Sequence, residues 1–397
     1  MDLALQDVRR HVGRFVTTIV GVALLQAVVL TMNGMYRGNV SDGVWLIEQT
    51  RADLWIVERG RGGPFNEQSR IPQQSYRSVA AIPGVARAAP FLTYTIERSI
   101  GGRSQHVTVV GYDVFNVLGG PPTLAAGRMI SAAHYELIAD SKLGLDIGDS
   151  IRLGVHEYMV VGVTHGAVDS GGNPLIYLSV PDAQEVLYQQ DNEAIRAERI
   201  ESSRQLEALG FSGAQLEKLA PLVNATRPTI GAVLVAVAPS ADVDIVAQAI
   251  RGGLRLEAFT TSQQRELMLK GRLARMTAIL GLFRALLVVV SIVIIALLIY
   301  VLTVEKVRSI ATLKLIGAPN WVIVRLIMEQ SVVLTLAAFT LGFALIAMTK
   351  DRFPRTLVLL PFDTVATGAV ILAGGMVASL VGVWRALRTP PSAALGA

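Results

Sequence analysis

Histidines, serines and glycine-rich stretches are the parts of this sequence that could do chemistry, and their spacing matches no site that performs it. His106, His134, His156 and His165 lie in one region, but no pair combines helical metal-ligand spacing with a third ligand nearby. Scattered histidines are therefore favoured over a metal site. The sequence contains no G-x-x-x-x-G-K-[ST] loop to hold nucleotide phosphates and no G-x-S-x-G turn to expose a nucleophilic serine. Cysteine is absent, which excludes disulfides, thiolate catalysis and cysteine-bound metals. We expect a non-catalytic chain that binds no cofactor or metal of its own.

The composition indicates a membrane protein rather than a soluble one. Of the 397 residues 52% are hydrophobic and 17% are charged, and the mean hydropathy is +0.48. Soluble domains carry about 25% charged residues, and so much apolar surface also excludes a disordered chain. The net charge of +5 comes from basic residues that flank apolar runs instead of gathering in one patch. We therefore expect contact with membrane lipids and none with nucleic acid.

Four apolar stretches are long enough to cross the roughly 30 Å of hydrocarbon in a membrane. We place the transmembrane helices at residues 15–36, 285–304, 326–348 and 364–384. The alternative for the first stretch is a cleaved signal peptide, but its apolar core is too long and no convincing cleavage site follows Met32.

Lysine and arginine in short loops predict the orientation of these helices. Basic residues precede the first span, occupy the connection between the second and third, and follow the fourth: Arg9, Arg10, Arg14, Lys306, Arg308, Lys314, Arg325, Arg385 and Arg388. Both ends, residues 1–14 and 385–397, and the connection 305–325 are therefore expected on the cytoplasmic side. The short outer loop 349–363 is a mild exception, because acidic residues offset its basic ones only in part.

Residues 37–260 are too long and too polar for a loop, and they predict a mixed α/β domain on the outer side. Strands are expected at 52–58, 85–97 and 106–112, a hairpin at 151–163, a β-α-β unit at 233–259, and further helices at 73–81, 182–190 and 194–219. A helix at 261–284 is expected to run without a break into the second span as a stalk. The predicted fold class is an α-helical membrane protein with four transmembrane helices and a large mixed α/β extracytoplasmic domain between helices one and two.

The N-terminal segment has the pattern of an amphipathic helix in the membrane interface. Leu5, Val8 and Val12 fall on one helical face, with Arg9 off that face and Arg14 just before the first span. The alternative is a positively charged flank that only sets the topology.

The connection 305–325 predicts a short helix with an apolar and a polar face. Four apolar residues share one face: Val304, Val307, Ala311 and Leu315. The turn from Gly317 to Pro319 has the composition of a helix stop. Such a helix is suited to dock on a soluble motor subunit, and the alternative is simply a well-capped helical hairpin. The candidate docking residues are Glu305, Lys306, Arg308, Ser309, Thr312, Leu313, Gly317 and Ala318.

Glu329 lies about one turn inside the third span, where an ionisable group usually faces protein or water. We predict a helix-packing or gating contact at Glu329, with snorkelling to the interface as the alternative.

The stretch EKVRSIATLKLIGAPNWVIVRLIMEQSVVLTLAAFTLGFALI resembles the FtsX/MacB-type (type VII) permease domain of ABC transporters. The matching positions are Glu305, Arg308, Leu313, Ile316, Gly317, Ala318, Glu329 and Gly342. The N-terminal segment is similar to the opening helix and first span of that family through Ala4, Arg9, Arg14, Thr18 and Gly21. The stretches ADLWIV, VVGYD, GGNPLIYLS and RALRTPPSAAL look most like the DevC branch. The resemblance spans essentially the whole chain and adds Gly342 to Glu329 as a gating or packing candidate.

The resemblance implies a homodimeric permease of the bacterial inner membrane, with a MacB-like periplasmic core domain at residues 37–260. It implies a separate ABC ATPase subunit, which would bind ATP and Mg, and mechanotransmission from that subunit to the periplasmic domains. A periplasmic adaptor (membrane fusion protein), an outer-membrane channel and a lipid, peptide or drug-like amphiphile as substrate are further expectations. The alternative function is that of an FtsX-like regulator, which transports nothing and switches an extracytoplasmic cell-wall hydrolase.

Overall fold

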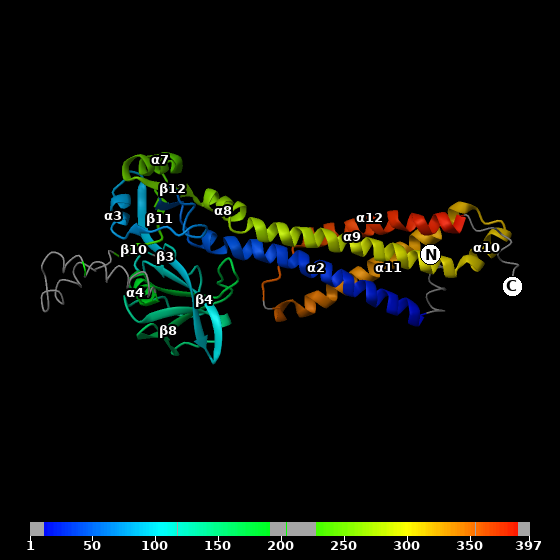
Figure 1. Ribbon diagram of the computed structural model, residues 1–397, viewed down its shortest axis with the longest axis horizontal. Helices are drawn as coiled ribbons and strands as arrows, with labels where there is room; N and C mark the ends of the chain where they lie inside the picture. Colours follow the sequence, from blue (N-terminus) through cyan, green and yellow to red (C-terminus); the bar gives the residue numbers. More distant parts are fainter. Residues whose placement is uncertain (1–11, 117, 191–203, 205–227, 354, 388–397) are drawn as a thin grey trace. The chain divides into compact units, whose positions relative to one another are not determined.

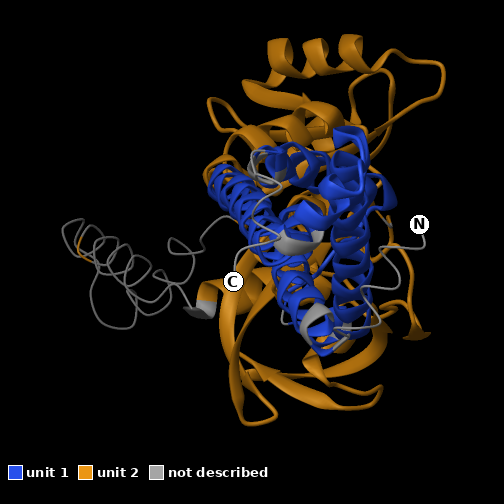
Figure 2. Ribbon diagram, turned by 90° about the vertical axis from the view of Figure 1, so that its right-hand side faces the viewer, with its two compact units in different colours: residues 1–39, 276–397 blue, residues 40–275 orange. Residues whose placement is uncertain are grey.

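The computed structural model describes residues 12–116, 118–190, 204, 228–353 and 355–387. The chain divides into two compact units, coloured separately in Figure 2: unit 1 is residues 1–39 and 276–397, and unit 2 is residues 40–275. The predicted helix at 194–219 lies outside the described residues, apart from residue 204. The elements, labelled in Figure 1 where there is room, are α2 (Val12–Gln49), β1 (Leu54–Glu58), β2 (Ile71–Pro72), α3 (Ser75–Ala80), β3 (Val85–Ile100), β4 (Arg103–Tyr112), β5 (Ala126–Gly127), β6 (Glu136–Asp140), η1 (Ser141–Leu143), β7 (Ser150–Leu153), β8 (His156–Thr164), β9 (Leu175–Ser179), α4 (Val180–Gln190), β10 (Thr229–Ile230), β11 (Ala232–Val237), α7 (Val243–Leu254), β12 (Leu256–Thr260), α8 (Thr261–Lys270), α9 (Ala274–Glu305), α10 (Val307–Leu315), α11 (Asn320–Thr349), η2 (Lys350–Arg352) and α12 (Pro361–Leu387).

Unit 1 is a bundle of long apolar helices. Within the described chain, α2, α9, α11 and α12 are long and apolar enough to cross a membrane, so the prediction of four spans is confirmed. Each helix buries aliphatic side chains in a shared core, among them Val29, Ile295, Leu334 and Ile371. Many aliphatic side chains on the outside of these helices are exposed, as expected where lipid tails replace water.

Helix α2 extends well beyond the first predicted span and ends at Gln49. Its last turns are amphipathic, because Leu46 and Ile47 are buried in the core of unit 2 beside Trp55. The helix stops where Arg51 takes a left-handed conformation, with φ +55°. One uninterrupted helix therefore contributes residues to both units.

The predicted unbroken stalk helix at 261–284 is wrong, because the chain turns between Lys270 and Ala274. Asn66 binds the chain on both sides of this break: its Nδ2 donates to the Leu267 carbonyl oxygen at 2.7 Å, and its Oδ1 accepts from the Arg272 amide at 3.2 Å. A Cβ at Gly271 would lie 2.7 Å from the same carbonyl oxygen, so this close approach needs glycine.

Unit 2 is the predicted mixed α/β domain. Its main sheet has the strand order β12-β1-β11-β3-β4-β9-β6-β8-β5, with β7 paired to β8, and β2 pairs with β10 in a small second sheet. The pairs β4–β9 and β6–β8 are parallel, and the other pairs are antiparallel. Strands β11 and β12 lie on either side of β1, so the predicted β-α-β unit is split by a strand from far earlier in the chain.

Glycines and alternating apolar residues explain these strands locally. Gly101 and Gly102 both have positive φ and join β3 to β4 in a tight two-residue turn, which makes both strands longer than predicted. The predicted hairpin at 151–163 is confirmed as β7–β8. Strand β1 is buried on both faces: Trp55 and Val57 lie in one cluster, and Leu54 and Ile56 in another that α7 covers.

Candidate functional site

The connection between α9 and α11 is a short helix held between two sharp turns. Helix α9 ends at Glu305, and α10 begins after Lys306. At its other end the Gly317 amide donates to the Lys314 carbonyl at 3.0 Å, and the Ala318 amide donates to the Leu313 carbonyl at 3.0 Å. Gly317 has φ +93°. This pair of bonds is the Schellman motif, which needs a left-handed residue and fixes where the helix stops.

The buried face of α10 differs from the predicted one. Ile310 and Ala311 are buried, and Ile310 lies in the bundle core with Ile299 and Ile323. Leu315, which the sequence places on the apolar face, is 51% exposed. The prediction extended one helical period from α9 into α10, but the turn at Lys306 resets that period.

The C-terminal end of α10 and the start of α11 expose large apolar side chains. Leu315, Ile316 and Trp321, which we call the α10 tip, are 51%, 79% and 62% exposed. They belong to the last residue of α10, its C-cap and the first turn of α11. Exposed apolar patches beside polar groups typically mark interaction sites. Two docking candidates, Glu305 and Thr312, are also exposed.

Two lysines tie α10 to neighbouring helices. Lys314 Nζ donates to the Leu387 carbonyl oxygen at the end of α12 at 2.8 Å. Lys306 Nζ donates to Gln330 Oε1 of α11 at 3.4 Å. The helix is therefore fixed against two of the long helices. Of the other docking candidates, Leu313 and Ala318 are half-buried, and the side chains of Arg308 and Ser309 lie outside the described part.

The two gating or packing candidates lie in different surroundings on α11. Glu329 Oε1 accepts from Arg325 Nε at 2.8 Å, one turn earlier on the same helix. Gly342 is buried where α11 crosses α2, and a Cβ there would lie 2.7 Å from the Ala23 carbonyl oxygen. Of the interface-helix candidates, Leu5, Val8 and Arg9 lie outside the described residues. Val12 and Arg14 belong to the first turn of α2, without a described side chain.

A buried polar contact in unit 1 was missed by sequence reasoning. Gln26 of α2 is fully buried, and its Nε2 donates to Ser291 Oγ of α9 at 3.2 Å. A glutamine inside an apolar stretch is the signal that could have indicated it, since amides in membrane helices usually bond to another helix.

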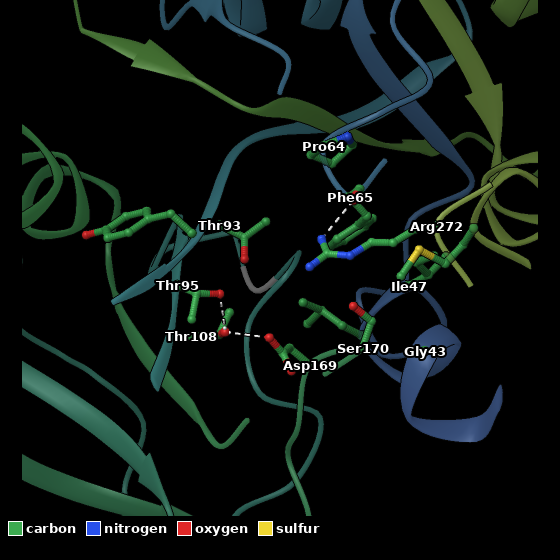
Figure 3. A pocket seen from close by; sticks show the side chains of 13 residues that line it. Gly43, Ile47, Pro64, Phe65, Thr93, Thr95, Thr108, Asp169, Ser170 and Arg272 are labelled. Carbon is green, nitrogen blue, oxygen red and sulfur yellow. Dashed lines mark hydrogen bonds between the residues drawn. The ribbon is translucent and has the colours of Figure 1, made fainter. Parts of the chain in front are cut away.

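Unit 2 contains a small cavity of about 140 Å³ (Figure 3). Asp169 and Arg272 supply its charged groups. Arg272 donates to the Phe65 carbonyl oxygen at 3.0 Å. Asp169 accepts from Thr108 Oγ1 at 2.7 Å (Figure 3). Asn173 Nδ2 and two backbone amides of the same loop also donate to Asp169. Because its acceptor positions are occupied by these donors, Asp169 braces the loop rather than offering a free carboxylate.

Two of the histidines of unit 2 form separate pairs with carboxylates. His134 Nδ1 lies 2.8 Å from Asp182 Oδ1, and His156 Nε2 lies 2.8 Å from Glu185 Oε1. Burial raises the pKa of Asp182, against the opposing effect of His134. Among the residues that the structure describes, no three His, Asp or Glu side chains are grouped to hold a metal ion.

Comparison with known proteins relates both units to the same class. A family model described as MacB-like periplasmic core domain matches residues 15–252, and one described as FtsX-like permease C-terminal matches residues 281–391. An uncharacterized ABC transporter permease of Mycobacterium tuberculosis is 24% identical over 393 residues, 99% of this chain and 98% of that protein. One from Mycobacterium bovis is 26% identical over 396 residues, with the same coverage. The periplasmic region of MacB from Actinobacillus actinomycetemcomitans matches 55% of this chain and 92% of its own, at 10% identity and a TM-score of 0.36.

Proposed function

Because the chain belongs to the FtsX/MacB-type permeases of ABC transporters, we propose that it is the moving membrane subunit of an exporter, driven by a separate ATPase subunit that docks on the α10 tip. Two copies of the chain form the permease in a bacterial inner membrane, with both termini and α10 cytoplasmic and unit 2 in the periplasm. ATP and Mg are bound by the ATPase. A lipid, peptide or drug-like amphiphile is extruded with a periplasmic adaptor and an outer-membrane channel.

The α10 tip is the observation that carries this proposal. A docking element has to be exposed, apolar enough to bind and stiff enough to pass on a push. Ile316 and Trp321 supply exposed apolar area, and the turn at Gly317 fixes their backbone. The bonds of Lys306 and Lys314 to α11 and α12 then link a push on α10 to the long helices.

Helix α2 supports movement of unit 2 as the output. It runs without a break from Val12 to Gln49 and ends with Leu46 and Ile47 buried in unit 2. A continuous helix transmits displacement along its axis better than a flexible linker does, because each residue is held by backbone hydrogen bonds.

Co-purification of the full chain with an ABC ATPase subunit of its own organism tests the docking role. We expect Ile316→Asp to lose the ATPase, since a carboxylate on the α10 tip has to be desolvated when a partner covers it. Phe115→Asp is the matched control, because Phe115 is an equally exposed apolar residue of unit 2 at 81%. Retention of the ATPase by Ile316→Asp would contradict docking at this site.

The same purification distinguishes the exporter from the alternative. An adaptor that purifies with the ATPase and permease supports export. A cell-wall hydrolase in its place supports the FtsX-like regulator, which would use the same α10 tip without transporting a substrate.

A further inference from the structure

The segment that leads into α12 lies tightly along α2. The Val358 amide donates to the Gly34 carbonyl oxygen of α2 at 3.2 Å. A Cβ at Gly38 would lie 1.8 Å from the Thr356 carbonyl oxygen, so no other residue type fits at position 38 without displacing the segment. At Gly34 a Cβ would lie 3.2 Å from the side chain of Leu359. Gly34 and Gly38, one helical turn apart, thus let this segment pack directly against the backbone of α2.

An ion pair closes the same contact. Arg37 of α2 binds Asp363 through two parallel hydrogen bonds, from Nη2 to Oδ1 at 2.8 Å and from Nε to Oδ2. The Asp363 side chain is 13% exposed and that of Arg37 is 38% exposed. Bidentate arginine–carboxylate pairs fix direction as well as distance. Asp363 also lies in the first turn of α12, where a negative charge suits the helix dipole.

Helix α9 is attached to the same stretch of α2. Arg284 Nη1 donates to Asn33 Oδ1 at 3.1 Å, and the Arg284 guanidinium lies 5.1 Å from the centre of the Tyr36 ring. The same short stretch of α2, residues 33–38, therefore contacts both α9 and the segment before α12.

We propose that Gly34, Arg37 and Gly38, together with residues 356–363, form a clasp that couples α12 to α2 throughout the transport cycle. This inference rests on the proposed function and adds a route for the motion. Lys314 holds α10 to Leu387 at one end of α12. Helix α12 spans about 40 Å at 1.5 Å per residue, and Asp363 at its other end holds α2. A push on α10 then reaches unit 2 through α12, the clasp and the last turns of α2, and Arg37 and Asp363 are positioning residues.

A designed disulfide tests whether the clasp stays closed. A Cβ at Gly34 would lie 3.7 Å from the Leu357 Cβ, within the 3.5–4.5 Å that disulfides need. The chain has no cysteine of its own, so Gly34→Cys with Leu357→Cys gives one defined cross-link. We expect the oxidised, assembled complex to keep the difference in hydrogen–deuterium exchange of unit 2 between its nucleotide-free and vanadate-trapped states. Loss of this difference on oxidation, with recovery on reduction, would show that the clasp must open and would overturn the proposal. Gly21→Cys with Leu357→Cys is the control, since Gly21 has no atom within 4 Å of its Cβ position.

Breaking the clasp tests its role in coupling. The readout is the difference in hydrogen–deuterium exchange of unit 2 between the nucleotide-free and vanadate-trapped complexes. We expect Gly38→Ala and Asp363→Asn to lose this difference while ATP hydrolysis continues, and Gly21→Ala to keep it. The double variant Arg37→Asp with Asp363→Arg should restore the exchange difference, because the exchanged charges can form the ion pair again. If the single variant had lost the difference only by disturbing the local packing, the double variant would not restore it.

The outcomes separate this inference from the proposed function. An exchange difference that persists in Gly38→Ala and Asp363→Asn would overturn the clasp alone. The absence of any nucleotide-dependent difference in the unchanged chain would overturn the proposed function and the clasp with it.

Discussion

Gly342 of α11 lies so close to Ala23 of α2 that a Cβ at residue 342 would stand 2.7 Å from the Ala23 carbonyl oxygen and 3.1 Å from the Ala27 amide nitrogen. Backbone thus approaches backbone at this crossing. In membrane helices such contacts replace the hydrophobic effect as a source of packing energy, because lipid tails are as apolar as the side chains.

Gly342→Ala should therefore destabilise the bundle by about 1–3 kcal/mol, the usual effect of overpacking a tight contact. Thermal unfolding of the full chain in mild detergent would measure the loss. Gly281→Ala is the matched control, because Gly281 of α9 has no atom within 4 Å of its Cβ position and alanine favours a helix. Equal stability of the two variants would contradict a tight contact between α11 and α2 at Gly342.

Gly317→Ala should loosen the end of α10. The residue has φ +93°, and an L-residue in a left-handed conformation costs about 1–2 kcal/mol. We expect faster hydrogen exchange at the Gly317 and Ala318 positions and weaker binding of the ATPase. Gly252→Ala in α7, whose Cβ position is also open, should leave both unchanged. If Gly317→Ala binds the ATPase as well as the unchanged chain does, the turn at Gly317 is not needed for docking.

Glu136→Gln should destabilise unit 2 in a pH-dependent way. The bidentate bond from Arg128 lowers the pKa of Glu136 to about 2, with the Ser131 and Ala132 amides adding to the effect. Because the pKa is lower in the folded chain, the stabilisation is complete above the unfolded value of about 4.3 and is lost as the pH falls through about 2. We expect Glu136→Gln to cost about 2–3 kcal/mol at pH 7 and roughly half of that at pH 3.

Urea unfolding followed by tryptophan fluorescence would measure this difference, since Trp55 is fully buried in unit 2. Glu157→Gln on the exposed side of β8 is the control and should cost little at either pH. A cost for Glu136→Gln that does not change between pH 7 and pH 3 would mean that the ion pair adds nothing to stability.

Asn66→Ala should loosen the break between α8 and α9. The Arg272 amide loses its acceptor at Asn66 Oδ1, and one hydrogen bond of this kind contributes about 1 kcal/mol. We expect hydrogen exchange at residue 272 to become faster by about fivefold. Asn116→Ala removes a comparable side-chain bond to the Ala88 carbonyl and should leave residue 272 unaffected. Slower exchange at residue 272 would show that the two helices merge once Asn66 is removed.

Local patterns were sufficient for the elements whose formation depends on near neighbours. An apolar run of about twenty residues has to become a helix in a membrane, because its backbone polar groups have no other partner there. The stop at Gly317 and the hairpin β7–β8 likewise depend on residues a few positions apart. The two-residue turn at Gly101 and Gly102, which joins β3 to β4, could have been predicted from the sequence by the same reasoning.

Contacts between distant parts of the chain were decided by the tertiary structure. The periodicity that placed Leu315 inside ended at the turn at Lys306, and the break between α8 and α9 is bound by Asn66, some 200 residues earlier in the chain. Arg37 and Asp363 are 326 positions apart, and no local pattern around either residue predicts that the other is its partner. The sequence by itself determined four spans and an inserted α/β domain, since hydrophobicity and turn chemistry act over short distances, and its resemblance to the FtsX/MacB-type permeases indicated the family. Which helices bind each other, and through which residues a push could travel, followed only from packing.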